Sequence, residues 1–214
     1  MREVIKKTEQ FVYDELHSEG SGHDWYHIDR VRKLALNLAQ MEGEGDLFII
    51  EMASLLHDIP DEKLNDSQQD GMKKLLRWLN DVPLELNQKE HIVQIIETIS
   101  FKGGNEAPLT SIEAKIVRDA DRLDAIGAIG IARTFAYAGN KGNPIYDPNI
   151  EVRENMTVHE YRKAPSSAIQ HFYEKLLKLK DLMQTTSGRK LAIERHLFLE
   201  QYLSQFFKEW NGEI

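Results

Sequence analysis

The sequence predicts an all-α protein, a helical bundle with a C-terminal helical elaboration. Three observations support this class. Apolar residues recur along most of the chain at the three- and four-residue spacing of a buried helix face. No stretch of alternating β-branched residues competes with that spacing. Residues that cap helices stand before several of the apolar segments. We therefore expect helices to form the core.

The first three helices are expected over residues 2–17, over residues 24–41 and from Asp46 to His57. The first two gather their apolar residues near one side. Asp46 is predicted to cap the third helix, which is apolar along its length. Pro60 is expected to end it, because the residue before a proline avoids helical geometry.

Three later helix starts are marked by pairs of residues with capping-box spacing or its Asn analogue. The pairs are Asn87 with Glu90, Thr110 with Glu113, and Thr157 with Glu160. They predict helices at about 88–100, 111–125 and 158–183. A final helix is expected to follow Ser187-Gly188 and to reach about Trp210.

Residues 139–156 form the only long stretch rich in turn signals. The segment carries aromatic and charged residues instead of low-complexity sequence, so we expect an ordered functional loop or lid. Tyr146 and Arg153 in this loop could cover a base and a phosphate of a substrate, although nothing in their spacing requires it.

One helical domain is expected over residues 1–214, with a core at about 20–140 and C-terminal helices at about 157–212. A chain of 214 residues can bury well over half of its unfolded surface, so it needs no disulfide or metal to fold. Cysteine is absent, which excludes disulfide scaffolds, thiolate zinc sites, iron–sulfur clusters and a cysteine nucleophile.

The charge balance argues against a general nucleic-acid-binding surface. The chain has 27 Lys and Arg against 35 Asp and Glu, a formal net charge of −8, whereas phosphate neutralisation needs a basic face. We expect no duplex nucleic acid as partner, but a local basic pocket for a small phosphorylated molecule is compatible. The first residues do not resemble a signal peptide, and no apolar run is long enough to span a bilayer. We therefore expect a cytoplasmic protein without membrane association.

A His-Asp pair, His57-Asp58, stands at the end of the predicted apolar helix. Imidazole nitrogen and carboxylate oxygen are both ligands for a borderline divalent ion. The dipeptide alone means little, because His23-Asp24 is a second copy. For an isolated pair, ordinary capping or a salt bridge is the competing interpretation.

Two further residues strengthen the metal interpretation. His27 lies one turn into an amphipathic helix, and Asp121 lies on a helix with apolar neighbours. A carboxylate close to a core face is costly unless it is paired or bound to a metal. For Asp121 the alternative is an ion pair with Arg118 or Arg122.

Together these residues resemble the H…HD…D pattern of the HD-domain superfamily of metal-dependent phosphohydrolases. The strings HDWYHIDRV, LLHDIPDEK, SFKGG and RDADRLDAIGAIGIARTF look like one bacterial branch of it, as do ENMTVHEY and HFYEKLLKLKDLM. The resemblance implies an HD-domain helical bundle whose metal ligands are His27, His57, Asp58 and Asp121. It implies hydrolysis of a phosphate bond and, in this branch, cleavage of (deoxy)nucleoside triphosphates to monophosphate and pyrophosphate.

One divalent cation is expected at these ligands. Two His and two Asp leave one or two positions of an octahedral ion open for water and a phosphate oxygen. Mixed ligation suits Mn²⁺, Fe²⁺, Co²⁺ or Ni²⁺ better than Mg²⁺, which prefers oxygen ligands. Mn²⁺ is the first choice because it also tolerates phosphate oxygens.

Three acidic residues are candidates for the catalytic base. Asp61 and Glu62 follow Asp58 by three and four residues, and in related hydrolases acidic residues after the motif help orient water or substrate. Asp124 shares a helix face with Asp121 and could polarise the nucleophilic water. The competing interpretations are a solvated turn for the first two and a structural hydrogen bond to a helix end for Asp124.

Seven residues are candidates for substrate binding. They are His23, Lys63, Lys102, Arg122, Arg133, His171 and Lys175. His23 precedes His27 by four residues, so it could support the metal site or the substrate. Lys102 precedes two glycines that let backbone approach a ligand. For His23 the alternative is exposure to water, and for Lys102 it is contact with a helix C-terminus.

Arginines suit bidentate phosphate contacts, although Arg122 could instead pair with a neighbouring Asp. His171 and Lys175 share a predicted helix face with Lys178, as a wall of a nucleotide site or as a solvated face. The aromatic residues of the last helix are expected in the core or in a homodimer contact. They are Phe198, Phe206, Phe207 and Trp210.

Two alternatives to triphosphate hydrolysis remain. One keeps the fold and the metal but acts as a nucleotidase or phosphodiesterase on a monophosphate or signalling nucleotide. The other belongs to a different class, a metal- or nucleotide-binding sensor without turnover. In each case the expected partner is a small phosphorylated molecule, a nucleotide.

Overall fold

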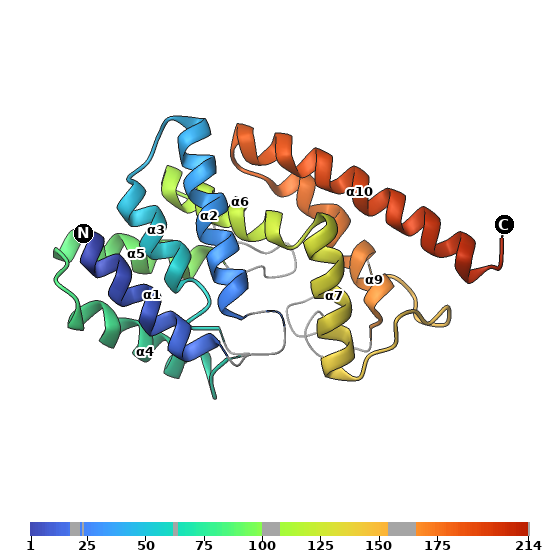
Figure 1. The fold of residues 1–214 in the computed structure, drawn as a ribbon, viewed down its shortest axis with the longest axis horizontal. Helices are drawn as coiled ribbons and strands as arrows, with labels where there is room; N and C mark the ends of the chain where they lie inside the picture. The colour runs from blue at the N-terminus through green and yellow to red at the C-terminus, as the bar shows by residue number, and fades with distance from the viewer. Residues whose placement is uncertain (18–21, 23, 62–63, 100–107, 154–165, 214) are drawn as a thin grey trace. The chain divides into compact units, whose positions relative to one another are not determined.

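The computed structural model of the chain describes residues 1–17, 22, 24–61, 64–99, 108–153 and 166–213. Every regular element among them is a helix (Figure 1), which confirms the predicted all-α class. These residues form two compact units, one that reaches Ala120 and one that starts at Asp121. The expectation of a single domain over residues 1–214 stays a prediction, and each unit is described by itself below.

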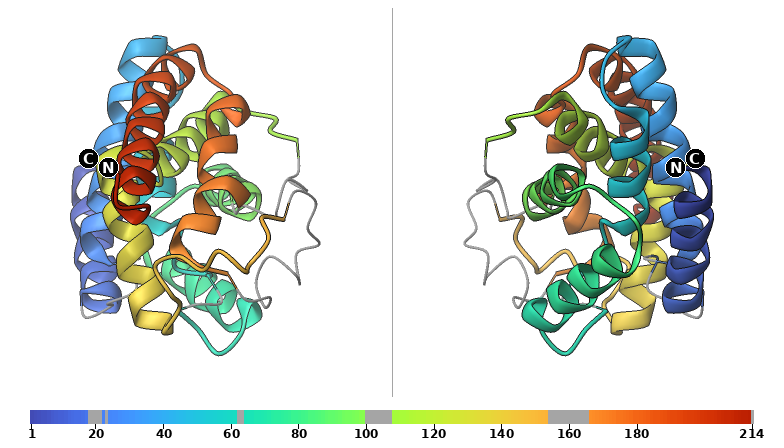
Figure 2. Two further views of the ribbon diagram at one scale, coloured as in Figure 1. Left: turned by 90° about the vertical axis from the view of Figure 1, so that its right-hand side faces the viewer. Right: turned by 90° about the vertical axis from the view of Figure 1, so that its left-hand side faces the viewer.

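The first unit contains α1 (Arg2–Leu16), α2 (Trp25–Glu42), α3 (Leu47–Leu56), α4 (Gln68–Asp81), α5 (Leu86–Ile99) and the larger part of α6 (Ile112–Asp124). Helix α3 packs against α1, α2 and α5 (Figure 2). A helix this rich in apolar residues must enter the core, and Ile50, Met52, Leu55 and Leu56 are fully buried. The core helix therefore ends directly at the His-Asp pair.

The predicted start of α3 is confirmed. The Asp46 carboxylate accepts hydrogen bonds from the backbone N–H groups of Phe48, at 2.8 Å, and Ile49, at 3.3 Å. This N-cap satisfies two of the amides that lack a partner within the helix.

Two other predicted starts in this unit are corrected. Helix α6 begins after Ser111, whose hydroxyl accepts from the Ala114 N–H at 3.1 Å, one residue later than the predicted cap Thr110. Helix α5 begins at Leu86, two residues before the predicted start. There the Gln88 side chain accepts from the Glu85 N–H at 3.1 Å, a backward contact of the capping-box kind.

Two helices are missing from the predicted set. Ser67 caps α4 by accepting from the Asp70 N–H at 3.1 Å, and its hydroxyl donates to the Asp70 carboxylate at 2.7 Å. Helix α7 (Gly127–Lys141) extends into the segment predicted as a loop and ends at Gly142, whose φ of 70° is the left-handed geometry of a helix end. The predicted loop therefore starts after α7.

A side chain of α6 also stabilises the start of α3. The Glu113 carboxylate, nearly buried, accepts from the backbone N–H of Asp46 at 3.0 Å. Burial raises the pKa of Glu113, but hydrogen bonds from the backbone of Asp46 and Glu113 and from Ser111 outweigh it, so the pKa lies below its ordinary value. The ionised form is thus favoured in the folded protein.

Glu113→Gln is expected to lower the free energy of unfolding at pH 7 by about 1 kcal/mol, because a charge-assisted hydrogen bond becomes a neutral one. Since the folded pKa is depressed, this stabilisation is present above 4.5 and is lost as the pH falls through the folded value. Urea unfolding at pH 7 and pH 4, with the exposed Glu97→Gln on α5 as control, measures it. An equal difference at both pH values would contradict the assignment.

The second unit contains the end of α6 together with α7, α9 (Ala168–Glu174), the 3₁₀ helix η1 (Leu176–Leu182) and α10 (Thr186–Trp210). Helix α10 packs against α7 and η1, and α9 packs against α7 and η1. Phe172 is fully buried and stacks on Tyr202 with ring centroids 5.7 Å apart, while Phe135 lies 6.2 Å from Phe172. These rings form the centre of the unit.

The prediction of one helix over 158–183 is wrong in its described part. Helix α9 ends at Glu174, Lys175 leaves helical geometry with φ −135° and ψ −60°, and the tighter η1 follows. Residues three apart lie on one side of a 3₁₀ helix, and Leu176 and Leu179 are both buried. The change of helix type thus lets leucines at this spacing enter one core.

The aromatic residues of α10 divide into packed and exposed groups. Phe206, Phe207 and Trp210 surround Tyr146, with ring centroids 4.9 to 6.1 Å from it. Phe198 is exposed. The homodimer contact stays a prediction. In the part of the chain that the structure describes, no helix has the length and apolar character needed to cross a membrane.

Candidate metal centre

His57 is placed by the end of the core helix. It is the C-cap residue of α3 and is buried. Its Nδ1 lies 2.8 Å from the backbone carbonyl oxygen of Ser54, an acceptor only, so Nδ1 carries the proton. In the neutral ring Nε2 is then the nitrogen with the available lone pair. The carbonyl of Ser54 therefore orients the ring and selects its tautomer.

His27 meets His57 from α2. The side chain is fully buried, and its Nε2 lies 3.2 Å from Nε2 of His57. Asp24 begins the helix, because its carboxylate accepts from the backbone N–H of His27 at 2.9 Å. The cap of α2 thus fixes the residue that contributes the second imidazole.

Two carboxylates complete the cluster. The Asp58 oxygens lie 3.3 Å from Nε2 of His27 and 3.4 Å from Nε2 of His57. Asp121 stands in the last turn of α6, and one ligand atom from each of His27, His57 and Asp121 lies within 4.8 Å of the others. Residues from three separate parts of the sequence, His27, His57-Asp58 and Asp121, therefore contribute to one cluster.

The donor set fits a divalent cation. Two buried ring nitrogens face each other at 3.2 Å, an arrangement that is favourable when a positive charge lies close to both lone pairs. Carboxylates of Asp58 and Asp121 supply the negative charge that a dication requires, and mixed imidazole and carboxylate ligands suit first-row transition metals.

The turn after the His-Asp pair is packed closely. The Asp61 N–H donates to the Asp58 carbonyl at 2.9 Å, and the Asn65 amide donates to the Asp61 carbonyl at 2.8 Å. Gly71 of α4 approaches so closely that a Cβ there would lie 2.6 Å from Cα of Pro60, so only glycine fits. Asp61 is half-buried in this turn, while the neighbouring candidates Glu62 and Lys63 lie outside the described residues.

Two predicted site residues bind each other. The carboxylate of Asp124, which is buried, accepts from Nη1 of Arg133 at 2.8 Å. Arg122, also buried, donates from Nη1 to the carbonyl oxygen of Leu182 at 2.6 Å. The structure thus gives these three candidates structural contacts within the second unit.

The predicted helix face that combines His171, Lys175 and Lys178 is not formed. His171 lies in α9 and Lys175 at the break after it, so the helical face that was expected to join them to Lys178 does not exist. His171 and Lys175 are half-buried. The remaining candidates, His23 and Lys102, lie outside the described residues.

The loop after α7 is held by buried polar groups of α9. Arg153 donates to both carboxylate oxygens of Glu174, at 2.6 and 2.8 Å. The Gln170 amide donates to the carbonyl oxygens of Asp147 and Ile150, at 2.7 and 3.0 Å. The described part of the loop is therefore packed as part of its unit, and the structure pairs Arg153 with a carboxylate.

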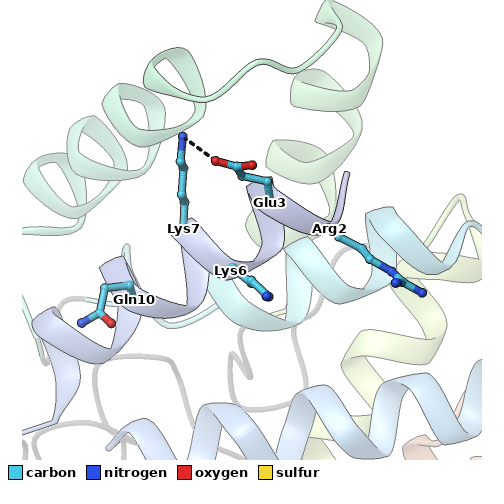
Figure 3. Close-up of a pocket in the computed structure, with 5 residues that line it drawn as sticks. All are labelled: Arg2, Glu3, Lys6, Lys7 and Gln10. Carbon is cyan, nitrogen blue, oxygen red and sulfur yellow. Dashed lines mark ion pairs between the residues drawn. The ribbon is translucent and has the colours of Figure 1, made fainter.

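Two surface pockets lie elsewhere. One, of about 460 Å³, is lined by Arg2, Glu3, Lys6, Lys7 and Gln10, all on α1. Figure 3 shows these side chains pointing in different directions from one helix, with Glu3 and Lys7 in an ion pair. The other, of about 450 Å³, lies on η1 and α10. Neither contains a predicted site residue.

Three residues near the site were not predicted. They are Ser54, Asp24 as the cap that places His27, and Arg195, which donates to the Leu123 carbonyl in the last turn of α6. Asp24 has a signal in the sequence, because an Asp at a helix start is a common cap. The contacts of Ser54 and Arg195 use backbone carbonyls and leave no such signal.

Comparison with known proteins gives one consistent family. The HD domain model matches residues 24–126. YpgQ of Bacillus subtilis is 40% identical over 214 residues, which cover 97% of this chain and 96% of that protein. A crystal structure of YpgQ in complex with ADP has 38% identity and a TM-score of 0.76, covering 96% of this chain and 97% of that chain.

Two further crystal structures are similar. A protein from Lactobacillus plantarum has 37% identity and a TM-score of 0.89, covering 100% of this chain and 99% of that one. An HD-superfamily hydrolase from Bacillus thuringiensis has 48% identity and a TM-score of 0.76, covering 99% of both chains. With the buried His and Asp cluster, these similarities show that the chain belongs to the HD-domain superfamily of metal-dependent phosphohydrolases.

Proposed function

We propose that this enzyme hydrolyses (deoxy)nucleoside triphosphates to the monophosphate and pyrophosphate, with one divalent cation held by His27, His57, Asp58 and Asp121. The observation that carries the proposal is the convergence of ligand atoms from His27, His57 and Asp121 within 4.8 Å of one another. The ADP complex of YpgQ supports a nucleotide as the substrate, because a nucleoside diphosphate contains the sugar and the α and β phosphates of the proposed substrate.

Each proposed ligand has a defined contribution. The imidazole of His57, oriented by the Ser54 carbonyl, presents Nε2, and His27 presents Nε2 from the capped start of α2. Asp58 and Asp121 add negative charge. When bound, the cation lowers the pKa of a coordinated water and neutralises charge on the phosphoryl oxygens. Mn²⁺ is the proposed ion, since it accepts both nitrogen and phosphate oxygen ligands.

The proposed reaction forms a bond between a water oxygen and the α-phosphorus and breaks the bond to the oxygen that bridges to the β-phosphorus. Pyrophosphate leaves, and the water gives up one proton. We assign Asp61 as the acceptor of this proton, because it lies in the turn that directly follows Asp58. Asp124 is less suited, since its carboxylate already accepts a hydrogen bond from Arg133 at 2.8 Å. Glu62 stays a candidate.

Phosphate groups of the substrate need cationic or N–H donors. Lys63 and Lys102 stay candidates for this role, with His23 as a further neighbour of the metal ligands in sequence. Arg122 and Arg133 are weaker candidates because each already donates to an oxygen of the second unit. His171 and Lys175 stay predictions.

The test is a panel of ribo- and deoxynucleoside triphosphates with Mn²⁺, Mg²⁺, Co²⁺ or Ni²⁺, in which pyrophosphate and inorganic phosphate are both measured. We expect one pyrophosphate per monophosphate, highest turnover with Mn²⁺, and loss of turnover with EDTA that added Mn²⁺ restores. Inorganic phosphate from a monophosphate would instead indicate a nucleotidase. Nucleotide binding without turnover under every cation would overturn the hydrolase and indicate a sensor.

A further inference from the structure

The carboxylate of Asp121 stands in a part of α6 that needs external support. The helix ends at Asp124, so Asp121 lies in its last turn. Carbonyl groups of a last turn have no partner within the helix, and such turns fray unless other groups bind them. A side chain in this turn keeps a fixed position only if the turn itself is held.

The last turn is held by Arg195 from α10. Nη1 of Arg195 donates to the carbonyl oxygen of Leu123, two residues after Asp121. The same oxygen accepts from the Ile126 N–H at 3.3 Å, which is a long and therefore weak contact. A guanidinium at a helix C-terminus is also favourable for the helix dipole. Arg195 thus provides both a donor and a charge where the helix ends.

The backbone that follows α6 leaves space for the side chain of this arginine. Gly127 has a φ of 75°, and a Cβ there would lie 3.1 Å from Cγ of Arg195 and 3.2 Å from its Cβ. The glycine therefore leaves room for the stem of the arginine. Asp124, paired with Arg133 at 2.8 Å, also attracts Arg195 electrostatically. The contact is built from the end of α6, the start of α7 and the middle of α10.

We infer that Arg195 is a positioning residue, which holds the last turn of α6 so that the Asp121 carboxylate stays in place for the divalent cation. The inference rests on the proposed function, since it assumes that Asp121 is a ligand. It extends that function to α10, a helix without a predicted metal ligand. In this role Arg195 acts through the Leu123 carbonyl and is not itself a ligand of the cation.

The test compares Arg195→Met with Arg189→Met. Arg189 also lies on α10 and donates to a backbone carbonyl, that of Met183 at 3.2 Å, so it is a matched arginine whose hydrogen bond is not to α6. The dissociation constant of Mn²⁺ is measured by titration calorimetry, and thermal unfolding is measured for both apo-proteins. We expect about tenfold weaker Mn²⁺ binding for Arg195→Met, as for other residues that support a metal ligand, and unchanged binding for Arg189→Met. Arg195→Lys should recover part of the affinity.

The outcomes separate the inference from the proposed function. If the wild-type protein binds no Mn²⁺, the proposed metal site fails. If it binds Mn²⁺ and Arg195→Met binds as tightly as Arg189→Met, only the positioning role is overturned. A loss of thermal stability alone, equal in both variants, also overturns the positioning role and leaves the metal site intact. Should Arg195→Met not fold, Arg195→Gln against Arg189→Gln decides, because the shorter neutral side chain cannot reach Leu123 in the same way.

Discussion

Asp121→Asn is expected to lose at least about 100-fold in Mn²⁺ affinity, more than the loss typical of residues that only support a ligand. Asn has nearly the same shape, but its carbonyl is neutral. The cluster would keep His27, His57 and Asp58 and lose one of its two negative charges. With less cation bound, hydrolysis should fall by about 10³-fold, which is at the upper range for removing one stabilising group from an active site.

His57→Gln should behave in the same way for a different reason. The variant removes the nitrogen that faces Nε2 of His27 at 3.2 Å. The matched control is His91→Gln on α5, a half-buried histidine whose Nε2 contacts the Ser111 hydroxyl at 3.1 Å. We expect the control to keep both Mn²⁺ binding and turnover.

Thermal unfolding with and without Mn²⁺ gives a second measurement that does not depend on turnover. A cation that binds only the folded protein raises the free energy of unfolding. The increase grows with the logarithm of the ratio of the free cation concentration to its dissociation constant. Wild type and His91→Gln should therefore gain stability on adding Mn²⁺, whereas Asp121→Asn and His57→Gln should gain little. If Asp121→Asn and His57→Gln both fold, keep full activity and respond to Mn²⁺ as the wild type does, the proposed site is wrong.

The features predictable from the sequence are those decided by neighbouring residues. Asp46 caps α3 through amides two and three residues away, and a helix this rich in apolar residues must enter the core. Both conditions depend on one short segment, and together they place His57 at the end of a buried helix. The helical class and the position of the His-Asp pair follow from such local rules.

The two His-Asp pairs show where local patterns stop being informative. Asp24, in the first copy, caps α2 by accepting from the His27 N–H, which is the ordinary interpretation of such a pair. Asp58, in the second copy, lies between two imidazoles. The dipeptides are identical, so the difference comes from the helices that meet at each one. The apolar helix that precedes His57-Asp58 already separates this copy from His23-Asp24, whose aspartate begins a helix, and the resemblance to a family adds the metal interpretation.

Contacts between residues far apart in sequence could not be predicted. Glu113 matches a local capping pattern, yet its carboxylate binds the N–H of Asp46, 67 residues away. Lys175 ends α9 although nothing in its neighbours forbids a helix, because the leucines after it reach the core through a 3₁₀ turn. Both outcomes depend on which surfaces pack together, and local sequence patterns do not predict that packing.

Arg153→Met is expected to lower the free energy of unfolding by about 3 kcal/mol, since breaking a buried ion pair leaves an uncompensated charge. Its partner Glu174 has a side chain only 1% exposed, and both carboxylate oxygens accept from Arg153. The effect should appear in urea unfolding of the protein without substrate. If Arg153 instead served the substrate phosphate, the variant would raise the KM and leave stability nearly unchanged.

A double variant separates two effects of Arg153→Met: the cost of leaving the Glu174 charge unpaired, and the loss of the arginine itself. Arg153→Met combined with Glu174→Leu removes both charges and places apolar side chains of similar size in the same space. Such replacements of buried pairs are often neutral or stabilising, so the double variant should regain most of the stability that Arg153→Met loses. The two effects then fail to add, as expected for residues in contact. A double variant as unstable as the sum of both single variants would mean that Arg153 holds the loop through its other contacts, and that Glu174 is not the reason for its placement.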